Sequence, residues 1–332
     1  MSGQVVVVTG ASAGIGRATA VAFARRGDKV ALLARGETGL AAAAEDVRTA
    51  GGTPLVVPVD VADAAAVDAA ADRVEAELGP IDVWCNVAFS TVFAKFEDIS
   101  AAEFARVTQV SYLGFVHGTM AALRRMKARD RGVIVQAESA LGRRGIPLQS
   151  AYCGAKHGIK GFTEALHTEL LIDKSNVAVT MVYIPGVNTP QFQWVLNKLP
   201  ERPQPVAPIY APELIADCLV HAAEHPRRRA WWVGIPTVYT IMGNMVWPQF
   251  LDWYLQRTGV SGQQTGVPAS ADPEVNLWEP ADRECDFGAD GVFSDKAWHR
   301  DPQIWASQHH GAVAVTVVAG VIAGMTALMR RS

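Results

Sequence analysis

Short apolar runs alternate with alanine-rich helical stretches along the first 190 residues of the chain. Nearly continuous apolar runs are typical of strands that are covered on both faces. The predicted strands cover residues 4–9, 29–34, 54–61, 81–88, 132–139 and 177–184, and a further strand at 230–235 is expected to close the sheet. The predicted helices cover residues 15–26, 38–50, 64–78, 102–128 and 152–172. This strict alternation predicts an α/β fold with a doubly wound parallel sheet and helices on both faces.

The pattern changes after the sixth predicted strand. Residues 186–212 are rich in proline and carry an apolar core, which predicts a flap over a site rather than scaffold. Residues 259–303 are rich in Gly, Pro, Asp and Ser and show little periodicity, which is typical of an irregular connector. We therefore expect a catalytic domain at 1–258, a connector at 259–308 and a separate apolar segment at 309–330.

That last segment contains an uncharged run from Gly311 to Met329. At 1.5 Å per residue, a helix of this length is about 28 Å long, close to the roughly 30 Å hydrocarbon thickness of a bilayer. Gly320 and Gly324 form a GxxxG pair that would let two such helices approach closely. The run predicts a C-terminal transmembrane anchor, and the alternative is a helix buried at an oligomer interface.

Three glycines, Gly10, Gly14 and Gly16, fall between the first predicted strand and the first predicted helix. Glycines at such a turn let the main chain approach a ligand closely, and the N-terminus of the following helix favours an anion. A dinucleotide pyrophosphate would fit this place. A tight turn that binds no ligand is the alternative.

A second group of residues indicates proton-transfer chemistry. Tyr152 and Lys156 stand four residues apart on a predicted helix, so both side chains project from one face. Ser139 lies at the carboxyl end of a predicted strand, where α/β sheets place their ligands. A nearby ammonium stabilises a phenolate, so Lys156 is expected to lower the pKa of Tyr152 towards a value that suits a general acid/base.

With these residues in this order, the chain resembles the short-chain dehydrogenase/reductase superfamily over roughly residues 3–255. The resemblance implies a Rossmann-type fold, with Ser139, Tyr152 and Lys156 as the catalytic serine, tyrosine and lysine. It also implies that Tyr152 and Lys156 contact the cofactor, together with residues of the sequences "TGASAGIG", "VDV", "CNVA" and "PGVNT". Those residues are Gly10, Ser12, Gly14, Ile15, Gly16, Asp60, Val61, Asn86, Pro185, Gly186, Val187 and Thr189.

Three positions depart from the family pattern. The asparagine that completes the family's catalytic set, and that is thought to hold a relay water, falls on Ser111. Ser111 is expected to keep that water. Phe89 replaces the last glycine of the family's NNAG strand, and Glu138 stands where a small hydroxyl residue is common. Glu138 is expected either to be solvated or to pair with Arg143 or Arg144.

The charge around the predicted ribose site indicates the cofactor. In relatives that prefer NAD, an acidic residue ends the second strand and binds both ribose hydroxyls. Here Arg35 follows that strand and Arg17 lies in the glycine turn. Two guanidiniums would suit a 2′-phosphate, so NADP(H) is predicted rather than NAD(H). The alternatives are that both are surface arginines, or that the enzyme is an NAD-dependent alcohol oxidiser.

Apolar residues are expected around the reacting group. The predicted substrate lining is Leu141, Pro147, Phe192, Trp194 and Val195. Such a wall favours a hydrophobic ketone or aldehyde, or the corresponding alcohol, over a sugar. Ordinary core packing would explain the same residues. The sequence therefore predicts an oxidoreductase that transfers a hydride between NADP(H) and an apolar carbonyl or alcohol.

Composition and charge limit the classes of partner that the protein is expected to bind. A formal net charge of -3 gives no electrostatic reason to expect nucleic acid. The four cysteines are widely separated and form no CxxC pair, which predicts reduced thiols and no metal site. We expect a cytoplasmic catalytic domain attached to a membrane, and the resemblance implies a homo-oligomer. Two other classes stay open: a regulator that binds NADP(H) without turnover, and a membrane scaffold on the same fold.

Overall fold

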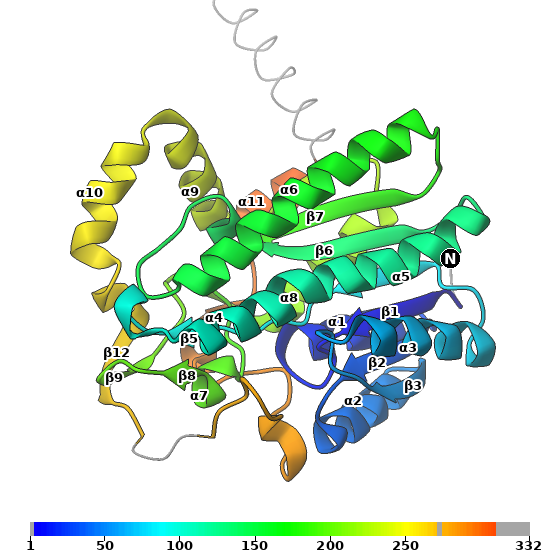
Figure 1. Ribbon diagram of the computed structural model, residues 1–332, viewed down its shortest axis with the longest axis horizontal. Coiled ribbons are helices and arrows are strands. Elements are labelled where there is room, and N and C mark those ends of the chain that lie inside the picture. Colours follow the sequence, from blue (N-terminus) through cyan, green and yellow to red (C-terminus); the bar gives the residue numbers. More distant parts are fainter. Residues whose placement is uncertain (1–2, 271–273, 310–332) are drawn as a thin grey trace, which may run out of the picture.

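The computed structural model describes residues 3–270 and 274–309, and a seven-stranded parallel sheet runs through its centre (Figure 1). The strands lie in the order β11-β7-β6-β4-β1-β2-β3. They are β1 Val5–Thr9, β2 Lys29–Ala34, β3 Thr53–Pro58, β4 Val83–Asn86, β6 Val133–Ser139, β7 Ala178–Ile184 and β11 Ala230–Trp232. The predicted doubly wound sheet is confirmed. Its order reverses between β1 and β4, and open α/β sheets bind ligands at such a switch point.

Helices cover both faces of the sheet. One face carries α1 Gly14–Ala24, α2 Glu37–Thr49 and α8 Pro212–Glu224, and the other carries α3 Ala64–Glu77, α5 Gly114–Ala128 and α6 Ser150–Ile172. Alternate residues of β1 serve the two layers: Val6 and Val8 pack with α1 and α2, whereas Val5 and Val7 pack with α3. Because both faces are buried, the strand is apolar at every one of these positions.

Local signals set where the helices begin. Asp63 caps α3 by accepting hydrogen bonds from Ala65 N and Ala66 N, and Ser100 forms a capping box with Glu103 at the start of α4 Ala101–Thr108. The single helix predicted at 102–128 is interrupted by a π-helical turn over Gln109–Leu113 before α5 continues. Such turns are frequent at functional sites, and this one contains Ser111.

The predicted flap at 186–212 is held in place by short strand pairs. It contains α7 Gln191–Trp194, β8 Leu196–Asn197, β9 Glu201–Pro203 and β10 Ile209–Tyr210. Strand β8 pairs with β5 Val92–Phe93, and β9 pairs with β12 Gln264–Pro268. Strand β10 pairs with β13 Ala297–Trp298. Two of these three partners come from the predicted connector, so the connector fixes the flap.

Residues 274–291 of the connector form a strap across the carboxyl ends of β1 and β2. Gly14 N donates to Gly288 O at 3.1 Å, and Arg35 donates to the carbonyls of Asn276 and Trp278. The strap is also tied to α2, because the Thr38 hydroxyl donates to Arg283 O. A segment about 270 residues away in sequence therefore lies against the glycine turn.

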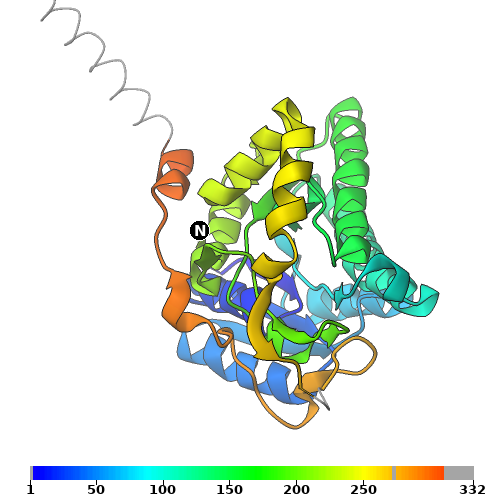
Figure 2. The same ribbon diagram turned by 90° about the vertical axis from the view of Figure 1, so that its left-hand side faces the viewer.

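Beyond the flap, α9 Ile235–Val246 and α10 Pro248–Thr258 form an arch at one end of the molecule (Figure 1). The last described helix is α11 Pro302–Gln308, the orange helix in Figure 2. Within residues 3–270 and 274–309, no helix combines the length and the apolar character needed to cross a membrane. The predicted anchor, residues 311–329, lies outside the described residues.

Candidate active site

The structure brings Ser139, Tyr152 and Lys156 together. Ser139 is the last residue of β6, and the other two lie in the first two turns of α6. Lys156 Nζ is 5.6 Å from the centroid of the Tyr152 ring, and the Ser139 side chain lies close enough to the phenol to influence its pKa. All three residues line one cavity of about 470 Å³, called here the Tyr152 cavity. Its size suits a small organic ligand.

Burial is the largest influence on the pKa values of Tyr152 and Lys156. It raises the pKa of Tyr152, and the neighbouring Ser139 side chain acts in the opposite direction. Burial lowers the pKa of Lys156 to about 8. The expected lowering of the phenol's pKa by Lys156 is absent in this structure. Instead, the ammonium donates to Ala137 O at 2.8 Å and lies 4.2 Å from the centroid of the Phe115 ring.

Glu138 is an additional carboxylate beside this group. Its side chain is 1% exposed and lines the Tyr152 cavity, and Oε1 accepts a hydrogen bond from Ser139 N. Burial raises its pKa to about 7, and the nearby Lys156 opposes that shift. The expected solvation of Glu138 is therefore wrong, because Gly142 leaves room for it inside: a Cβ there would lie 2.4 Å from Oε1.

The arginines expected to pair with Glu138 have other partners. Arg144 bonds Asp252 and Asn244, and the Arg143 guanidinium lies over the Tyr183 ring at 5.1 Å. Arg143 does oppose the rise in the pKa of Glu138, but only through space and after burial and Lys156.

The glycine turn forms the second pocket of the site, called here the glycine pocket. A Cβ at Gly16 would lie 2.1 Å from Gly10 O, and one at Gly10 would lie 2.8 Å from Ala88 Cα. Gly14 has a φ of +57°, which side chains rarely adopt. The pocket shares Ile15, Val87, Phe89, Thr189 and Gln191 with the Tyr152 cavity, so a long ligand can span both.

Most of the predicted cofactor residues line these two spaces. Those that line the glycine pocket are Gly10, Ser12, Gly14, Ile15, Gly16, Arg35, Asp60, Val61 and Thr189. Those that line the Tyr152 cavity include Tyr152, Lys156, Pro185, Gly186 and Val187. The Thr189 hydroxyl is buried between them and has no hydrogen-bond partner among the described residues. A bare glycine cradle with an unpaired hydroxyl beside it fits a dinucleotide.

Two predicted cofactor residues lie elsewhere. The Arg17 guanidinium is paired with Asp46 and Asp286, and it faces a separate depression rather than the glycine pocket. Asn86 is 1% exposed and is held inside the sheet by Trp84 Nε1 and Gln136 Oε1. Of the two arginines expected around the ribose, only Arg35 lines the glycine pocket.

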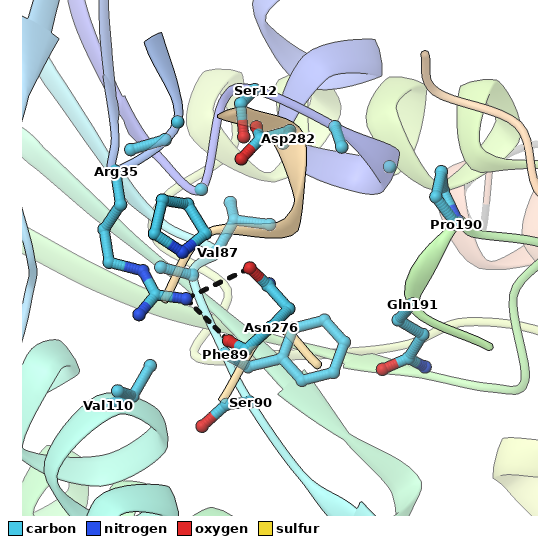
Figure 3. Close-up of a pocket in the computed structure, with 18 of the residues that line it drawn as sticks. Ser12, Arg35, Val87, Phe89, Ser90, Val110, Pro190, Gln191, Asn276 and Asp282 are labelled. Carbon is cyan, nitrogen blue, oxygen red and sulfur yellow. Dashed lines mark hydrogen bonds between the residues drawn. The ribbon is translucent and has the colours of Figure 1, made fainter. Parts of the chain in front are cut away.

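The strap supplies a side of the glycine pocket that the sequence analysis missed (Figure 3). Arg35 donates to both carbonyl oxygens of Asn276, at 2.6 Å to the backbone and 3.1 Å to the side chain. Asp282 is 5% exposed, and its carboxylate lies against Ser12, Gly36 and Gly39. Its Oδ2 is buried and has no hydrogen-bond partner among the described residues. A buried carboxylate of this kind suits a ligand hydroxyl.

Ser111 does not face either space. Its hydroxyl is fully buried, donates to Ser90 O at 2.6 Å and accepts from Ser90 N at 2.8 Å. Both of these contacts are with main-chain groups, so Ser111 ties residue 90 to the π-helical turn. The predicted catalytic role of Ser111 has no geometric support here.

The residues of the predicted substrate lining lie in different parts of the structure. Leu141 and Phe192 line the Tyr152 cavity, whereas Trp194 lines the glycine pocket. Pro147 packs near Gly259, and Val195 is buried in an apolar cluster with Phe93 and Phe192, so neither lines the cavity. Phe89 does, and its ring meets the Tyr152 ring edge-on with the centroids 5.7 Å apart.

The segment 204–207 of the predicted flap lines the Tyr152 cavity, but the walls contributed by α9 and α10 were not predicted. The residues from the two helices are Pro236, Thr237, Thr240, Leu251, Tyr254, Leu255 and Thr258. A helical pattern of apolar residues at 235–258 was available in the sequence. It could have predicted the helices, but not that one side of them faces the site.

Comparisons with known proteins agree with this geometry. A family model described as short chain dehydrogenase matches residues 4–198. The Bacillus subtilis protein named Uncharacterized oxidoreductase YxnA is 29% identical over 323 residues, which cover 96% of this chain and 89% of that protein. The Bos taurus protein named 3-ketodihydrosphingosine reductase is 34% identical over 197 residues, which cover 58% of this chain and 59% of that protein.

A solved structure shows the same relationship. The crystal structure of a candidate short-chain alcohol dehydrogenase from Sinorhizobium meliloti 1021 matches with a TM-score of 0.53 and 31% identity, covering 57% of this chain and 73% of that one. The family model spans more than half of the chain, and the relatives named above are oxidoreductases. The chain therefore belongs to the short-chain dehydrogenase family of oxidoreductases.

Proposed function

We propose that this protein is an NADP(H)-dependent oxidoreductase that interconverts a hydrophobic ketone or aldehyde and the corresponding alcohol. The observation that carries the proposal is the meeting of Ser139, Tyr152 and Lys156 in a cavity that joins the glycine pocket. The bound cofactor supplies or accepts the hydride. The chain contributes orientation, proton transfer and exclusion of water.

Each residue has a distinct part in carbonyl reduction. Tyr152 donates its phenol proton to the carbonyl oxygen, and its raised pKa keeps that proton in place until charge develops on the oxygen. Ser139 holds the same oxygen by a hydrogen bond. Lys156 provides a buried ammonium that lines the same cavity and can hold the nicotinamide ribose of the bound cofactor. In alcohol oxidation the same proton moves in reverse.

The cavity supports an apolar substrate. Phe89, Phe93, Leu141 and Phe192 line it near the catalytic group, and Leu251 and Leu255 line it from α10. Burying an apolar chain against these side chains contributes roughly 25 cal/mol for each Å² removed from water. The relative named 3-ketodihydrosphingosine reductase is consistent with a lipid ketone as the substrate class.

Turnover by the tyrosine variant tests the function. We expect wild-type protein to oxidise NADPH in the presence of long-chain ketones or aldehydes, and Tyr152→Phe to lose at least about a hundredfold in kcat, as expected for a lost proton donor. Binding of NADPH should be retained in the variant and serves as the folding control. Equal inertness of both proteins towards the whole panel, with binding intact, would favour the regulator that binds the cofactor without turnover.

Arg35 supports NADP(H) as the preferred cofactor, because its guanidinium lines the glycine pocket and can bind a 2′-phosphate. Asp282 favours a second candidate, NAD(H), because its unpaired carboxylate would repel a phosphate and accept hydrogen bonds from ribose hydroxyls. The two candidates therefore make opposite predictions for these two residues.

Fluorescence titration of NADPH and NADH against two variants separates the candidates. With NADP(H), Arg35→Ala weakens NADPH binding about tenfold or more through a lost charge-assisted bond and leaves NADH nearly unchanged. Asp282→Asn then strengthens NADPH binding. With NAD(H), Asp282→Asn instead weakens NADH binding, and Arg35→Ala has little effect on either cofactor.

We also propose that residues 311–329 anchor the protein to a membrane, with the catalytic domain on the cytoplasmic side, and that the protein forms a homo-oligomer. The support for the anchor is the uncharged run in the sequence. Extraction of the full chain from cell membranes tests it: an anchored protein needs detergent, whereas release by carbonate alone would contradict the proposal.

A further inference from the structure

The outer surface of α9 and α10 is unusually apolar. Within sixteen residues it exposes eight large apolar or aromatic side chains, each between 44% and 82% exposed. They are Tyr239, Met242, Met245, Val246, Trp247, Phe250, Trp253 and Tyr254, and we call this set the aromatic arch. Contiguous apolar patches of this kind mark interaction sites on soluble domains.

The two helices bury little of themselves against the rest of the protein. In α9 only Thr237 and Ile241 are buried, and no residue of α10 is buried. The helices pack against each other, and the Leu251 side chain would lie 3.5 Å from a Cβ at Gly243. Helices that are apolar on the side facing away from their own core need another apolar phase there.

The inner side of the same helices forms part of the Tyr152 cavity. Thr240 and Leu255 line the cavity, and Tyr254 both lines it and is exposed on the arch. The aromatic arch is therefore the outer surface of the cavity wall, on the opposite side from Ser139. An apolar ligand held on the arch is separated from the catalytic group only by this pair of helices.

The composition of the arch indicates which phase covers it. Helix α9 carries no charged residue, and α10 carries only Asp252 and Arg257. Asp252 is paired with Arg144, and the Arg257 guanidinium lies 4.0 Å from the centroid of the Trp253 ring. Tryptophan and tyrosine beside methionine, with a cation at the edge, are typical of a helix face at the boundary between lipid headgroups and acyl chains.

The position of the last described helix, α11, also favours a lipid bilayer as the phase that covers the arch. Asp301 at the start of α11 accepts a hydrogen bond from Ile235 N, and Gln303 accepts one from Gly234 N. The chain thus returns to the first turn of α9 shortly before the uncharged run 311–329 begins in the sequence. A second copy of the protein on the arch would cover the outer side of the cavity wall. A bilayer in the same place would supply the cavity with lipid-soluble substrate.

We propose that the aromatic arch docks in the interface of a lipid bilayer and that apolar substrate reaches the Tyr152 cavity from the lipid through this pair of helices. The entry of substrate rests on the proposed function. The docking does not, because it depends only on the exposed surface of α9 and α10.

A local probe tests the docking in the full chain, because the C-terminal run could bind vesicles by itself. Cys85, Cys153 and Cys218 are buried, so Cys285→Ser removes the exposed thiol among the four and allows labelling at one introduced cysteine. We place an environment-sensitive fluorophore at Val246→Cys on the arch and, as a matched control, at Ile172→Cys, which is 74% exposed on α6.

On addition of phosphatidylcholine vesicles, the probe at 246 is expected to shift to the blue and to be quenched by lipids that carry a quencher on the acyl chain. The probe at 172 should stay accessible to aqueous iodide. A probe at 246 that stays in water while the protein sediments with vesicles would overturn the proposal. So would a blue shift that appears without vesicles, because a second copy or another segment of the chain would then cover the arch.

Kinetics test the entry route separately. Val246→Glu and Met245→Glu place a charge on the arch without touching the cavity lining. For a long-chain ketone delivered in vesicles, KM should rise about tenfold, as expected when a charge weakens interfacial binding. For a short water-soluble ketone, kcat/KM should be unchanged. Equal KM values with wild type for the vesicle substrate would contradict entry from lipid, and absence of all turnover would contradict the proposed function while leaving the labelling result intact.

Discussion

At the scale of single residues, the sequence predicted which side chains lie together, but not how burial and neighbouring charges shift their pKa values. Ser139, Tyr152 and Lys156 are close because a strand end and the first turns of a helix place them there. Glu138 could not be placed in advance, since consecutive residues of a strand point to opposite faces and either side was open. The structure turns it inward, where it faces Lys156 rather than an arginine.

This placement makes Glu138 a positioning residue for the charge of Lys156. Burial lowers the pKa of Lys156 to about 8, and the Glu138 carboxylate partly opposes that shift. Lys156 is therefore a cation below about pH 8 and loses its charge above it. Glu138→Gln removes the opposing carboxylate, so the pKa of Lys156 should fall further and the alkaline limb of the kcat/KM profile should move to lower pH.

A pH profile of both proteins over the neutral to alkaline range checks this prediction. Affinity for the cofactor at a pH below both limbs serves as the control for folding. An alkaline limb at the same pH in the two proteins would show that Glu138 does not control the charge of Lys156.

At the scale of elements, the apolar runs predicted all seven strands of the central sheet within a few residues. This worked because parallel strands buried on both faces tolerate few polar residues. The predicted helix at 102–128 was correct in extent but hid the π-helical turn at Gln109–Leu113. One extra residue in a turn leaves no trace in the hydrophobic pattern. The catalytic role of Ser111, which the resemblance implied, stays a prediction.

The structure gives Ser111 a structural role, which a stability measurement can test. Ser111→Ala removes the only side-chain partner shown for the Ser90 main chain among the described residues. Leaving those part-buried groups unpaired should lower the free energy of unfolding by about 1–3 kcal/mol. Thr168→Ala, which removes an exposed hydroxyl bonded to Glu164 O within α6, should change it by less than about 0.5 kcal/mol.

Urea unfolding of the two variants measures both values. Equal stability of Ser111→Ala and Thr168→Ala would show that the tie to residue 90 contributes little. A loss of turnover in Ser111→Ala without a loss of stability would restore the catalytic role implied by the resemblance.

At the scale of the whole molecule, the least predictable part is the strap. Its contacts with Arg17 and Arg35 join residues about 240 to 270 positions apart, and its sequence has no periodicity that marks a partner. Composition predicted an irregular connector at 259–303, but not that part of it would form one side of the glycine pocket. Burial of Asp282 depends on that long-range contact, and the prediction for the cofactor changes with it.

The proposed reaction needs the glycine pocket and the Tyr152 cavity together, so it also belongs to the scale of the whole molecule. A hydride can pass from a cofactor in the glycine pocket to a carbonyl beside Tyr152 only if the two spaces join as they do here, through Ile15, Val87 and Thr189 among others. Neither pocket by itself would support the reaction, so the central claim concerns their junction.

Transfer of an isotope tests that junction most directly. Reduced cofactor in which both hydrogens at the reactive carbon of the nicotinamide are deuterium is incubated with wild-type protein and a long-chain ketone, and the alcohol is analysed by mass spectrometry. We predict one deuterium on the carbinol carbon with wild type, and no labelled alcohol with Tyr152→Phe that still binds the cofactor. Alcohol without deuterium, or equal labelling by the two proteins, would contradict the account.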